Sequence, residues 1–335
     1  MTGLPEQFPN QLEPASGPEN HGLDQSVPTP PFEAPPVPSS IESAPTPPAS
    51  LQENDDLLFQ QFVAPSLERI PHLGHVGILC LIALCSLFCA GLLARVGIHF
   101  RLFGVTTFAQ AASEIHYTLG TEGLLYLFTL GGSLIVFPMV WRKGFFDGLQ
   151  WRGHAALQRS GYLVAAAVAC FALAILNGLL LPGPTNTPID KIFRIPGAAW
   201  MLFGFGVTFA PFFEEMGFRG FLLPAFCTAF DWTAEKAAGQ PRHPLDENGH
   251  PQWSIPAMVV AAIITSILFA FLHADQTGYS LGPFLLLVCV SLVLCWARLA
   301  TRSLAASVIV HASYNFLLFS LMFFGTSGFR HLDRM

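Results

Sequence analysis

The most unusual feature of this sequence is a set of polar side chains placed within otherwise apolar runs. In chain order they form three short patterns: Glu214-Glu215-x-x-x-Arg219, Phe269-x-x-x-His273 and His311-x-x-x-Asn315. A charged group at bilayer depth costs from about 2.5 to more than 10 kcal/mol, so it is retained mainly where it pairs, faces a wet cavity or has a function. Hydrogen bonding between helices would explain one such pattern. Three patterns together favour a functional site.

The first pattern predicts an ion pair and one carboxylate outside it. Residues four apart lie on one face of a helix, so Glu215 can pair with Arg219 in a low-dielectric setting. Glu214 is rotated by about 100° from Glu215 and is left without that partner. We therefore expect Glu214 to be the catalytic base, with Glu215 and Arg219 as supporting residues.

The two later patterns supply imidazole rings and an amide. A single histidine in a membrane helix is about as often a structural group as a catalytic one, so His273 alone is a weak signal. His311 and Asn315 are four residues apart and can donate hydrogen bonds toward one point. Combined with Glu214, these residues predict a hydrolytic site with a base for water, a histidine that shares the proton, and donors for an oxyanion.

A metal site is the alternative reading of the same residues. Glu214, His273 and His311 would be three ligands of a divalent metal such as zinc, with water in the open position. Asn315 is a poor zinc ligand and a good oxyanion donor, which favours direct activation of water by Glu214. The spacing leaves both mechanisms open. The sequence lacks the His-Glu-x-x-His, Gly-x-Ser-Gly and Gly-x-Gly-Asp patterns of other membrane proteases.

The composition indicates that these residues are positioned by membrane-spanning helices. The chain is 52% hydrophobic and 11% charged, whereas soluble domains have roughly 25% charged residues. A crossing needs about 20 apolar residues. The sequence thus predicts an all-α, polytopic transmembrane helical bundle with about seven to eight spans. The apolar runs lie near 74–97, 121–141, 160–182, 197–226, 255–273, 281–299 and 303–325.

The composition also divides the chain into regions. Residues 1–65 are rich in Pro and acidic side chains, which predicts a disordered tail. Residues 70–327 are expected to form the multi-span membrane domain, with the catalytic core at about 195–325. More Lys and Arg residues fall on the N-terminal side of a seven-span arrangement than on the other side, which favours a cytoplasmic N-terminus.

The three ordered patterns resemble the CPBP family, which includes the type II CAAX prenyl endopeptidases and the Abi-like immunity proteins. The resemblance covers about residues 195–325. It implies an intramembrane endopeptidase in which Glu214 and His273 activate water while His311 and Asn315 stabilise the oxyanion. Members are described as metalloproteases, and a metal-independent glutamate mechanism is also argued for them.

We therefore expect an intramembrane protease that cleaves a membrane-associated or lipidated protein or peptide. The expected partners are this substrate and the lipid bilayer, with no nucleic acid. The rival hypothesis is a non-catalytic immunity or scaffold protein that uses the same polar cavity for binding. A proton-coupled transporter is a third possibility, although the sequence shows no internal repeat that would favour it.

Overall fold

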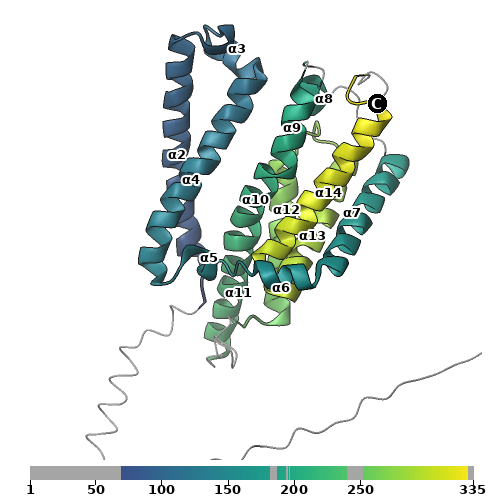
Figure 1. The fold of residues 1–335 in the computed structure, drawn as a ribbon. Coiled ribbons are helices and arrows are strands. Elements are labelled where there is room, and N and C mark those ends of the chain that lie inside the picture. Colours follow the sequence, from purple (N-terminus) through teal and green to yellow (C-terminus); the bar gives the residue numbers. More distant parts are fainter. Residues whose placement is uncertain (1–68, 182–186, 194, 196, 240–251, 331–335) are drawn as a thin grey trace, which may run out of the picture. The chain divides into compact units, whose positions relative to one another are not determined.

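The structure is a computed structural model that describes residues 69–181, 187–193, 195, 197–239 and 252–330. The chain divides into two units, Met1–Gln61 and Phe62–Met335, and every described residue belongs to the second. The Pro-rich tail predicted at 1–65 lies outside the described residues. Regular structure in the described ranges is helical, which confirms the expected all-α bundle (Figure 1).

Six described helices are long and apolar enough to cross a membrane. They are α2 (Leu73–His99), α4 (Ile115–Trp141), α7 (Ser160–Leu180), α12 (Ile255–Leu272), α13 (Leu281–Thr301) and α14 (Leu304–Gly325). The protein is therefore an integral membrane protein. The expected count of seven to eight spans is approximate, because the remaining apolar segment at 197–226 is not one helix.

That segment is divided into four consecutive helical pieces. Figure 1 shows them following one another along the chain. They are α9 (Ala198–Val207), α10 (Phe209–Glu215), the π-helix η3 (Met216–Leu222) and α11 (Leu223–Ala238). Pro211 explains the first break, because proline has no backbone N–H and its ring clashes with the carbonyl of Val207, four residues earlier. The break lies at Thr208, which has φ −113° and ψ −68°. Glu214 and Glu215 end α10, directly before the π-helix.

Helices α2 and α4 form an antiparallel pair (Figure 1). The polar stretch between them forms the short helices η2 (Leu102–Gly104) and α3 (Phe108–Ser113), as expected for a segment that does not cross. Thr107 caps α3, because its side chain accepts from the backbone N–H of Gln110. After α4, the short helices α5 (Phe145–Gly148) and α6 (Gly153–Gln158) lead to α7.

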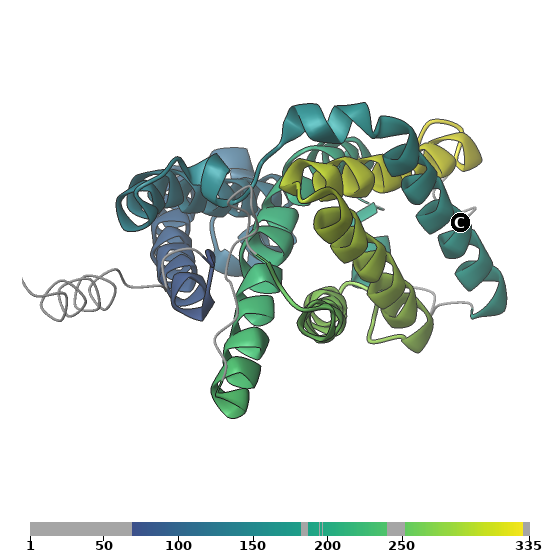
Figure 2. The same cartoon turned by 90° about the horizontal axis from the view of Figure 1, so that it is seen from below.

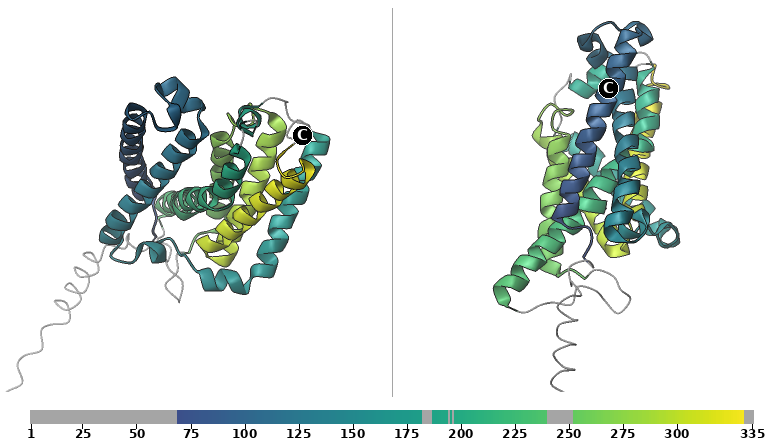
Figure 3. Two further views of the ribbon diagram at one scale, coloured as in Figure 1. Left: turned by 45° about the horizontal axis from the view of Figure 1, so that its top comes forward. Right: turned by 90° about the vertical axis from the view of Figure 1, so that its left-hand side faces the viewer.

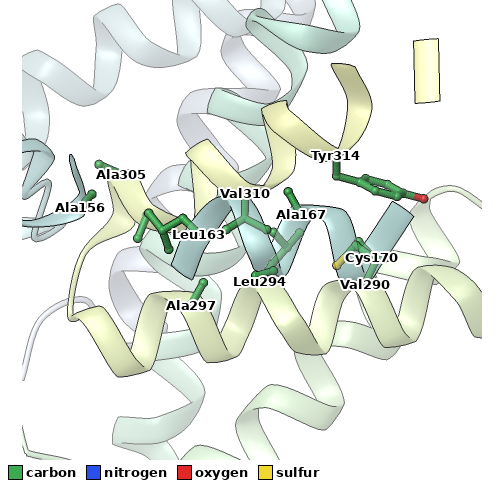
Figure 4. Close-up of a cluster of buried hydrophobic side chains, with 12 residues drawn as sticks. Ala156, Leu163, Ala167, Cys170, Val290, Leu294, Ala297, Ala305, Val310 and Tyr314 are labelled. Carbon is green, nitrogen blue, oxygen red and sulfur yellow. The ribbon is translucent and has the colours of Figure 1, made fainter. Parts of the chain in front are cut away.

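The largest buried cluster joins α7, α13 and α14 (Figure 4). Small side chains such as Ala167, Ala297 and Ala306 allow these helices to approach closely. Leu163, Leu294 and Val310 fill the space between them. This packing fixes α14 next to α13, and α14 also contacts α10. The cluster thus holds the helix that carries His311, and this helix in turn contacts the one that carries the two glutamates.

The link between α11 and α12 differs from expectation at its start. The sequence indicates an aqueous loop from Asp231 to Ser254, but α11 continues to Ala238, and residues 240–251 lie outside the described ranges. Figures 2 and 3 show the C-terminal end of α11 extending away from the other helices. Asp231 accepts hydrogen bonds from the backbone N and Oγ of Ser254 at 2.8 and 2.6 Å. Because Ser254 caps α12, Asp231 fixes where that helix begins.

Candidate active site

The ion pair expected from the first pattern is present and buried. Nη1 of Arg219 donates to Oε1 of Glu215 at 2.8 Å, and both side chains are 0% exposed. Nη2 of Arg219 donates to the backbone O and the Oγ of Ser291 on α13, at 3.1 and 2.6 Å. Hydrogen bonds to other groups are what make a buried ion pair tolerable. The pair is therefore anchored to a second helix.

His311 on α14 shares the carboxylate of Glu215. Nδ1 of His311 lies 2.9 Å from Oε1 of Glu215. A carboxylate paired with a guanidinium accepts hydrogen bonds, so Nδ1 carries the ring hydrogen. The other ring nitrogen, Nε2, points toward Glu214 at 3.8 Å from its Oε2.

His273 is oriented in the same way by a different acceptor. It caps the C-terminal end of α12, and its Nδ1 lies 2.9 Å from the carbonyl oxygen of Phe269. Because a carbonyl only accepts, Nδ1 again carries the hydrogen and Nε2 holds the lone pair in the neutral ring. Nε2 of His273 lies 3.7 Å from Oε2 of Glu214. Two imidazoles thus present the same nitrogen to one carboxylate oxygen.

The structure therefore brings together Glu214, His273 and His311 from α10, α12 and α14. Separations of 3.7 and 3.8 Å exceed a direct hydrogen bond but suit groups bridged by one water molecule. All three side chains are largely buried. The arrangement can bind a water molecule and accept its protons within a mostly dry environment.

Asn315 on α14 donates a hydrogen bond to the broken segment. Its Nδ2 donates to the carbonyl oxygen of Gly206 at 2.8 Å. In an uninterrupted helix that carbonyl would bond to the backbone N–H of residue 210, and the break at Thr208 lies between the two. Asn315 thus connects α14 to the broken segment. Nδ2 carries two hydrogens, so one remains for another acceptor.

Phe269 makes a contribution that the sequence did not reveal. Its ring lies 4.7 Å from the guanidinium carbon of Arg219 and 4.6 Å from the ring of His273. The ring of His311 lies 5.9 Å away. This buried ring packs against the cation and both imidazoles and so helps to fix their positions.

Glu122 and Tyr126 on α4 lie next to the site, and the three sequence patterns do not include them. The hydroxyl of Tyr126 donates to Oε1 of Glu122 at 2.9 Å, and its ring stacks on Phe213 at 4.6 Å, next to Glu214. Phe213 directly precedes Glu214, so the pair on α4 packs against the segment that carries the site. A glutamate in the apolar run 121–141 is the signal that would have found this pair.

Within the described ranges, no group of three His, Cys, Asp or Glu side chains is arranged around a common metal position. The alternative with Glu214, His273 and His311 as metal ligands stays a prediction, and a chelator tests it.

A carboxylate and two imidazoles thus meet within a helical membrane domain. Residues 196–317 match the family model described as type II CAAX prenyl endopeptidase, Rce1-like. The resemblance to the CPBP family is confirmed over this segment, which supports a CAAX-type intramembrane endopeptidase in general. The match covers less than half of the chain and leaves α2 to α7 outside it. No curated protein and no solved structure matches the chain.

Proposed function

We propose that this protein is an intramembrane endopeptidase that hydrolyses a peptide bond in a membrane-associated or lipidated protein or peptide. The observation that carries the proposal is the position of Oε2 of Glu214, 3.7 Å from Nε2 of His273 and 3.8 Å from Nε2 of His311. A structural hydrogen-bond network would place these groups in direct contact. Their spacing instead fits a water molecule between them.

In the first step, this water is activated. A water about 2.8 Å from Oε2 of Glu214 donates one proton toward that oxygen and its other proton toward Nε2 of His273. Glu214 takes its proton as the water oxygen attacks the carbonyl carbon of the peptide bond. The result is a tetrahedral intermediate with a negative oxygen and a protonated Glu214.

In the second step, the intermediate collapses. Glu214 passes its proton to the leaving nitrogen, the C–N bond breaks, and the products are a carboxylic acid and an amine. The family resemblance assigns oxyanion stabilisation to His311 and Asn315. Asn315 retains one Nδ2 hydrogen for this purpose, while His311 donates from Nε2 only after that nitrogen has received a proton.

The test uses the detergent-purified protein and a fluorogenic peptide library that includes a prenylated CAAX peptide, the substrate class named for the matched family. Glu214→Gln is expected to reduce the cleavage rate by about 10²–10⁴-fold, because the amide cannot accept the proton. Glu114→Gln is the matched control. Its hydrogen bond from His116 holds the pKa of the Glu114 carboxyl below its usual range, so this variant removes one carboxylate charge outside the site.

Two further outcomes separate the alternatives. Loss of cleavage with a strong chelator and its return with zinc would replace the proposed mechanism by a metal-assisted one. If the wild-type protein cleaves nothing, and Glu214→Gln keeps its biological activity, the protein is a binding or immunity protein that uses this cavity without catalysis.

A further inference from the structure

A second buried arginine, Arg298 on α13, binds the backbone of the segment that carries the site. It is 2% exposed. Its Nε donates to the carbonyl oxygen of Arg219 at 3.2 Å, and its Nη2 donates to the carbonyl oxygen of Leu149 at 3.4 Å. A buried guanidinium that binds carbonyl oxygens is unusual, since burial of a charge is expensive. The reason for it lies in the π-helix.

The π-helix η3 leaves one carbonyl without a backbone donor. In a π-helix each carbonyl accepts from the N–H five residues later, and the N–H of Leu223 bonds in this way to the carbonyl of Phe218. The next carbonyl is that of Arg219, and its donor would be residue 224. Residue 224 is proline, which has no N–H. Nε of Arg298 occupies the place of this missing donor.

The same helix also holds the Arg219 side chain. Ser291 and Arg298 are seven residues apart, two turns of α13, and therefore lie on one face. Ser291 accepts from the guanidinium of Arg219, while Arg298 donates to its backbone carbonyl. Helix α13 thus fixes both the side chain and the backbone carbonyl of Arg219, the residue that pairs with Glu215.

The approach of η3 to its neighbours leaves little room for adjustment. A Cβ atom placed on Gly220 would lie 3.3 Å from Cδ2 of Leu304 and 3.4 Å from Cδ2 of Leu149. The position of Leu149 is itself tied to Arg298 through its carbonyl. A shift of the π-helix would therefore displace Glu214 and Glu215, which precede it, from the two histidines.

We infer that Arg298 is a positioning residue for the proposed reaction: it replaces the backbone donor that Pro224 lacks and so holds the π-helix in the register that aims Glu214 and Glu215. This inference rests on the proposed function for its catalytic readout. The hydrogen-bond replacement itself has a second readout in protein stability, which does not depend on cleavage.

The test is a double-substitution cycle with Arg298→Met, Pro224→Ala and both together. Methionine keeps much of the length of arginine without its donors, and alanine restores an N–H at residue 224. Arg298→Met is expected to lower kcat for the library peptide by about 10–100-fold with KM unchanged, and to lower the melting temperature by about 5 °C. Adding Pro224→Ala is expected to recover part of both losses, because it restores a donor for the carbonyl of Arg219 but not the bond to the carbonyl of Leu149.

A matched control is Arg159→Met. Nη1 of Arg159 also donates to a backbone carbonyl near the end of α13, that of Ala300, at 3.2 Å, but this arginine is exposed and outside the proposed site. This variant is expected to keep wild-type kcat and KM.

Three results would overturn the inference: full activity and stability of Arg298→Met, no rescue by Pro224→Ala, or failure to recover the double variant when Pro224→Ala alone is recovered. Rescue of Arg298→Met by Pro224→Ala in the melting experiment supports the inferred hydrogen bond even if the wild type cleaves nothing. In that case the proposed function fails and the structural part of the inference stands.

Discussion

The Nδ1 atom of His311 lies 2.9 Å from Oε1 of Glu215, although the two residues are 96 positions apart in the chain. The same oxygen accepts from Nη1 of Arg219 at 2.8 Å. Glu215 therefore links the arginine to the histidine, and it determines which nitrogen of His311 faces Glu214. The carboxylate that the sequence indicates as a structural ion-pair partner also orients a proposed catalytic ring.

Because Glu215 both pairs with Arg219 and orients His311, substitutions can separate the effect of its charge from its effect on the His311 ring. Arg219→Met alone leaves the Glu215 carboxylate buried without its cation, and we expect a loss of about 3–5 kcal/mol in stability. Glu215→Leu with Arg219→Met removes both charges, and we expect a smaller loss of about 1–3 kcal/mol. Replacing a buried pair by apolar residues is often neutral, but the buried Nδ1–H of His311 loses its acceptor. Thermal melting in detergent measures both effects.

Activity should distinguish two double variants that both lack the buried ion pair. Glu215→Gln with Arg219→Met keeps an amide oxygen for Nδ1 of His311, whereas Glu215→Leu with Arg219→Met keeps no acceptor. We expect the glutamine variant to retain kcat at least about tenfold above the leucine variant, the usual effect of losing an orienting partner. Equal kcat values would show that Glu215 does not orient His311.

Asn315 provides a second prediction, because it bonds to Gly206 and is also the proposed oxyanion donor. Asn315→Leu is expected to lower kcat by about 10²–10³-fold with little change in KM. It should also reduce stability by about 1–3 kcal/mol, since the carbonyl of Gly206 loses its donor.

The control for Asn315 is Thr208→Val at the same helix break. Oγ1 of Thr208 donates to the carbonyl of Gly204 at 2.6 Å, so this variant also removes a side-chain bond to the broken segment. We expect it to keep kcat near the wild-type value. If Asn315→Leu also cleaves at the wild-type rate, Asn315 is a structural residue only.

Much of this architecture follows from hydrophobic runs and four-residue spacing. The six long helices, the Glu215–Arg219 pair and the meeting of Glu214 with His273 and His311 agree with what the sequence predicts. These features depend on local periodicity and on the cost of isolated polar groups in a membrane. Both properties are encoded within single helices.

What the sequence did not reveal depends on contacts between distant segments. The break near Pro211 can be expected from the proline itself, but the π-helix that follows depends, by our inference, on Arg298 of a distant helix, which hydropathy does not show. The contact of Asn315 with Gly206 exists only because that helix is broken. Hydropathy counts apolar residues and does not report which carbonyl lacks a donor.

The orientation of the protein in the membrane remains a prediction from its basic residues. Helices α2 and α4 each have 27 residues and are antiparallel, so the segment 100–107 and the segment 142–153 are expected on opposite faces. Arg142, Lys143 and Arg152 favour the cytoplasmic side for the second segment. An epitope inserted after residue 143 should be digested by protease in inside-out vesicles, and one inserted after residue 104 should be protected. The reverse pattern would contradict the predicted orientation.

Glu122 and Tyr126 predict that the proposed site extends beyond the segment that matches the family. Glu122 accepts from the hydroxyl of Tyr126, and the ring of Tyr126 stacks on Phe213, the residue before Glu214. Glu122→Ala removes the acceptor of the Tyr126 hydroxyl, so we expect kcat/KM to fall by roughly tenfold, the size of a lost hydrogen bond. Glu122→Gln keeps an acceptor for Tyr126, so its kcat/KM should fall less. Steady-state kinetics with Glu114→Gln as the control measures the difference. If kcat/KM of Glu122→Ala equals the wild-type value, α4 lies beside the site without taking part in the reaction.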